Sequence, residues 1–130
     1  MKIVSLSEDK NFEKRIAVTP DIAKKYIDLG FELSLPENYG KHLGFEDDLY
    51  KKVGVEISKD ENNLIKNADL IVQLGLLSDD KLQLIKEGQS LIGALNPYDN
   101  KTKLETLAKK KINIFSLEKL PRITRAQSMD

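Results

Sequence analysis

Ala68-Asp69-Leu70-Ile71-Val72-Gln73-Leu74 is the stretch of the sequence that most clearly indicates a buried strand. It is apolar almost throughout and β-branched in the middle, which is typical of a strand covered on both faces in a parallel sheet. On either side of it, short apolar runs alternate with amphipathic stretches about five times. This alternation predicts an α/β fold with three layers: a parallel sheet with helices on both faces, of the Rossmann or flavodoxin kind.

Local signals set the boundaries of the expected elements. Thr19 is suited to cap a helix that starts at Pro20, and Gly30 is suited to end it. Gly54 and Gly88 are expected to stop two further helices. The expected strands are 2–6, 31–35, 55–57, 68–74, 90–95 and 112–117, and the expected helices are 20–29, 46–53, 61–67, 78–87 and 101–110.

The segment after Pro121 is expected to begin another helix over residues 124–130, with Thr124 as its cap. The sequence ends at Asp130, after about two turns, and a helix that short is marginal by itself. We therefore expect that the polypeptide is cut here and that residues 1–130 are a truncated first domain.

Composition excludes several classes of function. Lys+Arg and Asp+Glu both number 21, so the net charge is zero and nothing favours nucleic acid or anionic lipid as a partner. There is no cysteine, and the single histidine, His42, has no visible company for a metal site, so it is expected at the surface and no metal is expected. No apolar run approaches the roughly 20 residues of a membrane span, and no signal peptide is visible. The chain is therefore expected to be soluble and cytoplasmic, without direct membrane insertion.

The glycines do not form a dinucleotide-binding loop. Such a loop needs Gly-x-Gly-x-x-Gly between a strand and a helix, so that the backbone can approach the pyrophosphate. None of the seven glycines has this spacing, and no Walker-type phosphate loop is present. The sequence therefore does not contain a complete nucleotide pocket of the usual kind.

Two segments carry a resemblance to a known family. The first runs from Glu8 to Pro20 and includes Arg15 and the run Ala17-Val18-Thr19-Pro20; the second is the ten-residue run Pro121-Arg122-Ile123-Thr124-Arg125-Ala126-Gln127-Ser128-Met129-Asp130. Together they resemble the alanine dehydrogenase/transhydrogenase family. The second segment is similar to a signature of the branch formed by the alpha subunit of NAD(P) transhydrogenase, and the resemblance spans the whole chain.

The resemblance implies that residues 1–130 are the N-terminal domain, incomplete, of that alpha subunit, and that the Rossmann domain with the glycine-rich loop is absent from this chain. The complete subunit would be the NAD(H)-binding component of a proton-translocating transhydrogenase, passing hydride to or from NADP(H) on a partner subunit. The implied partners are the membrane and NADP-binding subunits and a second copy in a homodimer. The implied location is the cytoplasmic side of the inner membrane, held there through partner subunits, and the isolated chain is expected to be inactive.

The resemblance also implies the site residues Arg122, Gln127 and Asp130, which match family residues at the nicotinamide end of the NAD(H) site. A Gln side chain offers a donor and an acceptor, as a carboxamide does. Hydride transfer needs two rings held face to face and no general acid from the protein. For an unrelated sequence, solvated polar side chains would be the simpler interpretation; the family match favours the site for these three residues, and less so for Thr124, Arg125 and Ser128.

Two alternatives remain open. One is an alanine dehydrogenase-like oxidoreductase, in which the position of Arg15 binds the substrate carboxylate. That branch also uses a lysine and a histidine where this sequence has Gln73 and Asn96, so its acid/base groups are missing and Arg15 is expected to brace a loop through Glu8 or Glu13. The other alternative is a non-catalytic truncated module. The sequence departs from the transhydrogenase pattern as well, with Val4-Ser5-Leu6 where Gly-x-Pro is usual and Gln73 where both branches have lysine.

Overall fold

The computed structural model describes residues 1–7, 15–75, 77–93, 101–117 and 123–125, and the side chains of residues 116, 117 and 123–125 are not included in that description. The strands are β1 (Lys2–Val4), β2 (Glu32–Pro36), β3 (Glu56–Ser58), β4 (Leu70–Gln73), β5 (Ser90–Gly93), β6 (Asn113–Leu117) and β7 (Ile123–Arg125). The helices are α1 (Pro20–Asp28), the 3-10 helix η1 (Lys41–Leu43), α2 (Asp47–Lys52), α3 (Glu61–Asn67), α4 (Asp79–Leu82) and α5 (Lys101–Lys109).

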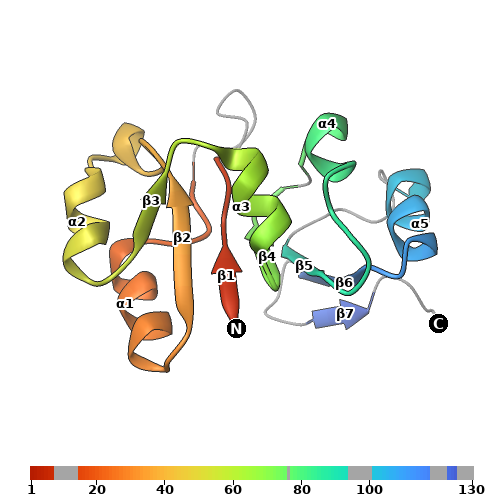
Figure 1. Ribbon diagram of the computed structural model, residues 1–130, viewed down its shortest axis with the longest axis horizontal. Coiled ribbons are helices and arrows are strands. Elements are labelled where there is room, and N and C mark those ends of the chain that lie inside the picture. Colours follow the sequence, from red (N-terminus) through yellow and green to blue (C-terminus); the bar gives the residue numbers. More distant parts are fainter. Residues whose placement is uncertain (8–14, 76, 94–100, 118–122, 126–130) are drawn as a thin grey trace.

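The strands form one sheet in the order β3-β2-β1-β4-β5-β6-β7 (Figure 1). β1 to β6 pair in parallel, and β7 pairs antiparallel with β6. The order 3-2-1-4-5-6 is that of a doubly wound Rossmann-type sheet, in which the direction of strand addition reverses between β1 and β4. The predicted fold class is therefore confirmed.

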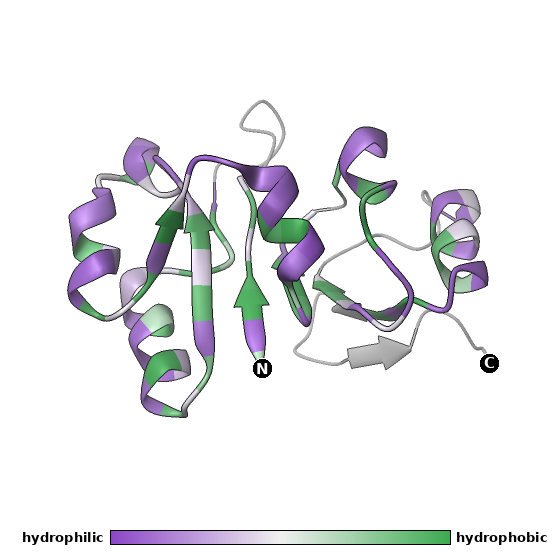
Figure 2. Ribbon diagram, in the orientation of Figure 1, coloured by the Kyte–Doolittle hydropathy of each residue, from purple (hydrophilic) through white to green (hydrophobic). Residues whose placement is uncertain are grey.

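Two hydrophobic clusters cover the two faces of the sheet. The neighbouring residues Ile3 and Val4 belong to different clusters, as expected when successive side chains of a strand point to opposite faces. The cluster of Ile3 includes side chains from α1 and α2, and the cluster of Val4 includes side chains from α3, α4 and α5. In Figure 2 apolar colour gathers on the strands and on the inward sides of the helices, which agrees with this layering.

Short-range signals fix α1 as predicted. Thr19 is the N-cap, and its Oγ1 accepts a hydrogen bond from Ile22 N–H at 3.3 Å. Pro20 occupies the first helical position, where its missing N–H costs nothing. Gly30 has a φ of 96°, a conformation that glycine adopts without strain, so the chain turns there into β2.

Several local expectations differ from the structure; the strand expected over 2–6, for example, ends at Val4. The predicted helix over 124–130 is wrong at its start, since Ile123–Arg125 forms β7; the β-branched Ile123 and Thr124 suit a strand, and the edge of β6 offers backbone partners from Phe115 to Leu117. Residues 126–130 lie outside the described residues. The short helix η1 was not expected either; it lies between the expected strand 31–35 and the expected helix 46–53.

The predicted helix over 78–87 is also wrong in its length, because α4 ends at Leu82. Leu84 N–H and Ile85 N–H bond to carbonyls three residues back, which is a turn and not a continued α-helix. Lys86 N–H then bonds to the side chain of Gln89 at 2.6 Å, which removes its need for a helical partner. The tight turn brings Ile85 into the core, where it is 2% exposed.

Candidate functional site at the topological switch point

The strands β1 and β4 separate at their carboxyl ends, where the strand order reverses. Their backbone register pairs Ile3 with Leu70 and Val4 with Ile71, and the ladder stops there. In doubly wound sheets this is the place where ligands bind, in the crevice outside the carboxyl ends of the strands. The side chains that follow the last pair therefore form the inner wall of the candidate site.

Gln73, the last residue of β4, bridges the gap with its side chain. Its Oε1 accepts a hydrogen bond from Leu6 N–H, and its Nε2 donates to Leu6 C=O at 3.1 Å. The side chain is buried, with 1% exposure. The side-chain amide thus joins β4 to the end of β1 two residues beyond the last pair of the backbone ladder.

A chain of hydroxyl groups runs beside this amide. Ser5 Oγ donates to Val72 C=O at 2.6 Å, and because a hydroxyl has one proton, Tyr39 donates in the 2.8 Å contact between Tyr39 Oη and Ser5 Oγ. Tyr39 Oη in turn accepts from Val18 N–H at 3.1 Å. This chain links the end of β1 to Val18, just before the cap of α1.

Tyr50 completes the arrangement from α2. Its hydroxyl donates to Val18 C=O at 2.9 Å, and its ring meets that of Tyr39 edge to face, with centroids 6.0 Å apart. Burial raises the pKa of the Tyr50 hydroxyl above its ordinary value, and the neighbouring Tyr39 and Asp47 add to the rise. We call the side chains of Ser5, Tyr39, Tyr50 and Gln73 the switch-point network.

The switch-point network is suited to positioning and not to proton transfer. Its members are neutral at pH 7, and a general acid or base needs a pKa near the working pH. Within the described ranges, no three His, Cys, Asp or Glu side chains come together as a metal site would require. Nor is any helix in those ranges long and apolar enough to cross a membrane.

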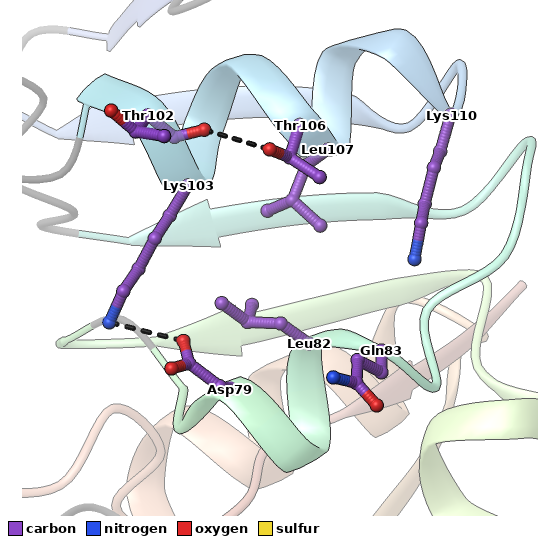
Figure 3. Close-up of a pocket in the computed structure, with 8 residues that line it drawn as sticks. All are labelled: Asp79, Leu82, Gln83, Thr102, Lys103, Thr106, Leu107 and Lys110. Atoms are coloured by element: carbon purple, nitrogen blue, oxygen red, sulfur yellow. Dashed lines mark hydrogen bonds and ion pairs between the residues drawn. The ribbon is translucent and has the colours of Figure 1, made fainter.

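A separate groove of about 260 Å³ lies between α4 and α5 (Figure 3). Leu82 and Leu107 face each other across it, and Lys103 Nζ reaches Asp79 Oδ1 at 3.2 Å. The polar side chains that line it are all exposed. Binding sites usually combine an apolar pocket with a few fixed polar groups, whereas the polar side chains of this groove are exposed to water. The switch point is therefore the stronger candidate.

The structure does not test the predicted site residues. Arg122, Gln127 and Asp130 lie outside the described residues, as do Asn96, Glu8 and Glu13. Arg15 is exposed and directly follows residues 8–14, which lie outside the described residues. His42 is exposed on η1, as expected for a surface histidine. The site residues expected from the sequence therefore stay predictions.

Sequence reasoning missed the role of Gln73. Gln73 stood out in the sequence only as a departure from a lysine, and Val4-Ser5-Leu6 only as a departure from Gly-x-Pro. One signal was present: a polar side chain at the end of an otherwise apolar strand, where a buried side chain must find hydrogen-bond partners. Its partner residue lies 67 positions away, so the sequence did not identify it.

Comparison with known proteins gives consistent results. Over residues 5–130 the chain matches the family described as alanine dehydrogenase/PNT, N-terminal domain. It is 38% identical over 134 residues to the first part of NAD(P) transhydrogenase subunit alpha of Rickettsia prowazekii, and 35% identical over 135 residues to the protein of that name from Rhodospirillum rubrum. Each alignment covers 100% of this chain and 35% of the relative, so the chain spans about a third of their length.

More distant relatives include alanine dehydrogenase 1 of Staphylococcus aureus, 27% identical over 127 residues, with 98% of this chain and 34% of that protein covered. Among solved structures, a transhydrogenase from Sinorhizobium meliloti has a TM-score of 0.81 at 29% identity, covering 98% of this chain and 38% of that one. An L-alanine dehydrogenase has a TM-score of 0.83 at 19% identity, covering 91% of this chain and 32% of that one, which is a likeness of fold alone.

Proposed function

This chain belongs to the alanine dehydrogenase/PNT N-terminal domain family, and on that premise we propose that it is the N-terminal part of the NAD(H)-binding component of a proton-translocating NAD(P) transhydrogenase. The observation that carries the proposal is identity of 38% and 35%, along the whole chain, to two transhydrogenase alpha subunits. The alanine dehydrogenase of Staphylococcus aureus reaches 27%. The completed protein exchanges hydride between NAD(H) and NADP(H) held by a partner subunit.

In this proposal Arg122, Gln127 and Asp130 hold the nicotinamide end of NAD(H). NAD(H) supplies the hydride chemistry, while these residues orient the carboxamide and ribose by hydrogen bonds. The backbone of β7 supports this assignment for Arg122 alone. Ile123 pairs with Leu117, the last residue of β6, so the residue that follows Arg122 lies at the carboxyl edge of the sheet. That edge is where ligands of doubly wound sheets bind.

The switch-point network also supports hydride exchange over amino-acid oxidation. Oxidising an amino acid requires a group that accepts a proton, and the switch-point network offers a neutral amide and neutral hydroxyls. Gln73, which stands where the resemblance places a lysine, has both polar atoms of its side chain bonded to Leu6. Hydride exchange between two nicotinamide rings makes no such demand on the protein.

The proposal extends to assembly and location. In the proposal the glycine-rich nucleotide loop lies outside residues 1–130, in which none of the seven glycines has the required spacing, and the other transhydrogenase subunits supply the membrane and NADP(H) functions. We propose a homodimer on the cytoplasmic side of the inner membrane, held there by those subunits. The isolated 130-residue chain is then inactive and binds NADH very weakly.

The first test is the intact mass of the native polypeptide that carries this N-terminus, followed by an assay of that polypeptide with its partner subunits. Reduction of an NADP analogue by NADH, with no oxidation of alanine, supports the proposal. Alanine oxidation without NADP(H) supports the dehydrogenase alternative instead. A native chain that ends near Asp130, with no hydride exchange in the presence of its partner subunits, would leave only a non-catalytic module.

A matched pair of variants tests the site residues. Gln127→Ala is expected to raise KM for NADH by roughly tenfold, the effect of losing one or two hydrogen bonds of about 1 kcal/mol each. Gln83→Ala, at an exposed glutamine of the groove between α4 and α5, is the control and should leave KM unchanged. Equal KM values for the two variants would remove Gln127 from the site.

A further inference from the structure

Beyond the backbone ladder, the side chain of Gln73 connects β4 to the end of β1 across the switch point. The backbone ladder between β1 and β4 ends at Val4 and Ile71, and continuing its register would place Leu6 opposite Gln73. The backbones do not pair there; instead the Gln73 amide bonds both the N–H and the C=O of Leu6. The side chain therefore sets the distance between the two strands where the crevice opens.

An amide is the side-chain group suited to this contact. Leu6 presents one donor and one acceptor, and glutamine presents one of each in return. Lysine has no acceptor, an ionised glutamate has no donor, and methionine has neither in useful strength. Because Gln73 is 1% exposed, water does not replace a missing partner. A glutamine is thus a neutral side chain that satisfies both groups of Leu6.

The connection between β1 and α1 is held by hydrogen bonds near both of its ends: Gln73 bonds Leu6 after β1, and two tyrosines bond Val18 before α1. The chain leaves β1 through Ser5 and Leu6 and returns to α1 through Val18. Val18 is held by the hydroxyls of Tyr39 and Tyr50 at 3.1 and 2.9 Å. Ser5 joins the two ends, since it contacts Tyr39 Oη at 2.8 Å and Gln73 Oε1 at 3.5 Å. A shift at Gln73 therefore moves the start of the whole β1–α1 connection.

We propose that Gln73 is a positioning residue of the nucleotide site: its amide clamps Leu6 and so fixes where the chain leaves β1 at the switch point. The inference rests on the proposed function for the identity of the ligand, NAD(H), and on the hydrogen bonds alone for the clamp. It assigns Gln73 a role through Leu6 and not through contact with the reacting atoms.

Three variants test the clamp in the complete polypeptide. Gln73→Met keeps the length of the side chain and removes both hydrogen bonds. Gln73→Glu restores a donor and an acceptor only while its carboxyl group is protonated. Gln83→Met, on the exposed surface, is the control.

The first measurement is amide hydrogen exchange at Leu6, which depends on the clamp and not on catalysis. Gln73→Met should speed exchange of the Leu6 N–H by at least roughly tenfold, as expected for a buried amide that loses its acceptor, while Gln83→Met leaves it unchanged. Unchanged exchange in Gln73→Met would overturn the clamp.

The second measurement is KM for NADH as a function of pH. Gln73→Met should raise KM on the order of tenfold at every pH, because small displacements of a positioning segment weaken ligand alignment. Gln73→Glu should raise KM at least as much as Gln73→Met at pH 8, because its ionised carboxylate has no donor and is buried, and it should approach the wild-type KM as the pH falls to 5 and its carboxyl group protonates. A merely structural residue would lower the amount of folded protein without this pH-dependent rescue of KM.

The outcomes separate the two hypotheses. If the wild-type polypeptide exchanges no hydride with its partner subunits present, the proposed function fails, and the Leu6 exchange rate still decides whether the clamp exists. If hydride exchange occurs and both Gln73 variants keep the wild-type KM at every pH, the positioning role of Gln73 is wrong.

Discussion

Replacing Gly40 by alanine should destabilise the protein through one identifiable collision. A Cβ atom at Gly40 would lie 2.8 Å from Tyr50 Oη, 3.0 Å from Phe45 Cβ and 3.3 Å from Tyr50 Cε2. Real Cβ atoms essentially never approach another atom as closely as the first of these distances. The backbone at Gly40, with a φ of −110°, is open to any residue, so the cost is steric and not conformational.

Tyr50 has little freedom to move away. Its hydroxyl donates to Val18 C=O at 2.9 Å, and its ring packs edge to face on Tyr39 at an interplanar angle of 83°. Overpacking a buried site of this kind costs about 1–3 kcal/mol of the free energy of unfolding. Tyr50→Phe alone should cost about 1–2 kcal/mol, because Val18 C=O loses the hydrogen bond from Tyr50 in a buried position.

The double variant Gly40→Ala/Tyr50→Phe tests the reasoning. Without the hydroxyl oxygen the added methyl loses its shortest contact, so the combined loss should be smaller than the sum of the two single losses by about 1 kcal/mol. Urea unfolding with unchanged m-values measures each term. Tyr26→Phe, at a partly exposed tyrosine of α1, is the control and should combine additively with Gly40→Ala. Additive losses for the Gly40 and Tyr50 changes would refute the proposed collision.

Three further outcomes are expected. Gln89→Met should lower the free energy of unfolding by about 2–4 kcal/mol in urea titrations, because the buried amide bonds three backbone groups, whereas Gln83→Met should change it little. The folded-state pKa of Tyr50 is raised above the unfolded value of about 10, so stability should be constant with respect to this group below that pH and fall as the pH rises above it; Tyr50→Phe should remove that component of the pH titration. Lys103→Met removes the ion pair between Lys103 and Asp79, whose two side chains are 47% and 70% exposed, respectively. Because exposed ion pairs contribute little, thermal unfolding should detect a decrease in the free energy of unfolding of no more than about 0.5 kcal/mol.

The elements that the sequence predicted well are those fixed by neighbouring residues. The helix α1 begins at Pro20 because Thr19 caps it, and the chain turns at Gly30 because glycine accepts a φ of 96°. Gly54 likewise has a positive φ just after α2, as expected, whereas Gly88 has one well after the end of α4 at Leu82. Such signals operate within about four residues, so sequence alone reveals them.

The elements that the sequence predicted poorly depend on distant partners. The segment Ile123–Arg125 forms a strand because it pairs with β6 at the edge of the sheet. The sequence of the segment does not indicate that β6 lies next to it. The helix α4 ends early because Lys86 N–H donates to the side chain of Gln89 and not to a helical carbonyl. The Nε2 of Gln89 donates in turn to the carbonyls of Ile65 and Ala68 at 2.6 and 2.8 Å. A side chain that joins the end of α3 to the turn before β5 is visible only after the chain has folded.

The residues of the candidate site also fall into two groups. The expected ligand-binding residues were predicted from a sequence motif, whereas the residues of the switch-point network were identified only from the fold. Ser5, Tyr39, Tyr50 and Gln73 are separated by up to 68 positions and meet because the strand order reverses between β1 and β4. The alternating pattern predicted the class of sheet, and that class predicts a crevice at the reversal. It did not predict which polar groups would close the gap.

The burial of the switch-point network explains why neutral side chains are found there. Each of its four side chains is at most 1% exposed, and an isolated charge in such a position carries a large desolvation cost unless a partner of opposite charge is present. A glutamine at position 73 avoids that cost while satisfying both polar groups of Leu6. The inner wall of the crevice therefore contributes shape and hydrogen-bond order but no charge. In the proposed nucleotide site, charge recognition then falls to residues outside this wall, among which we expect Arg122 and Asp130, while the wall itself holds Leu6, where the chain leaves β1, in a fixed place.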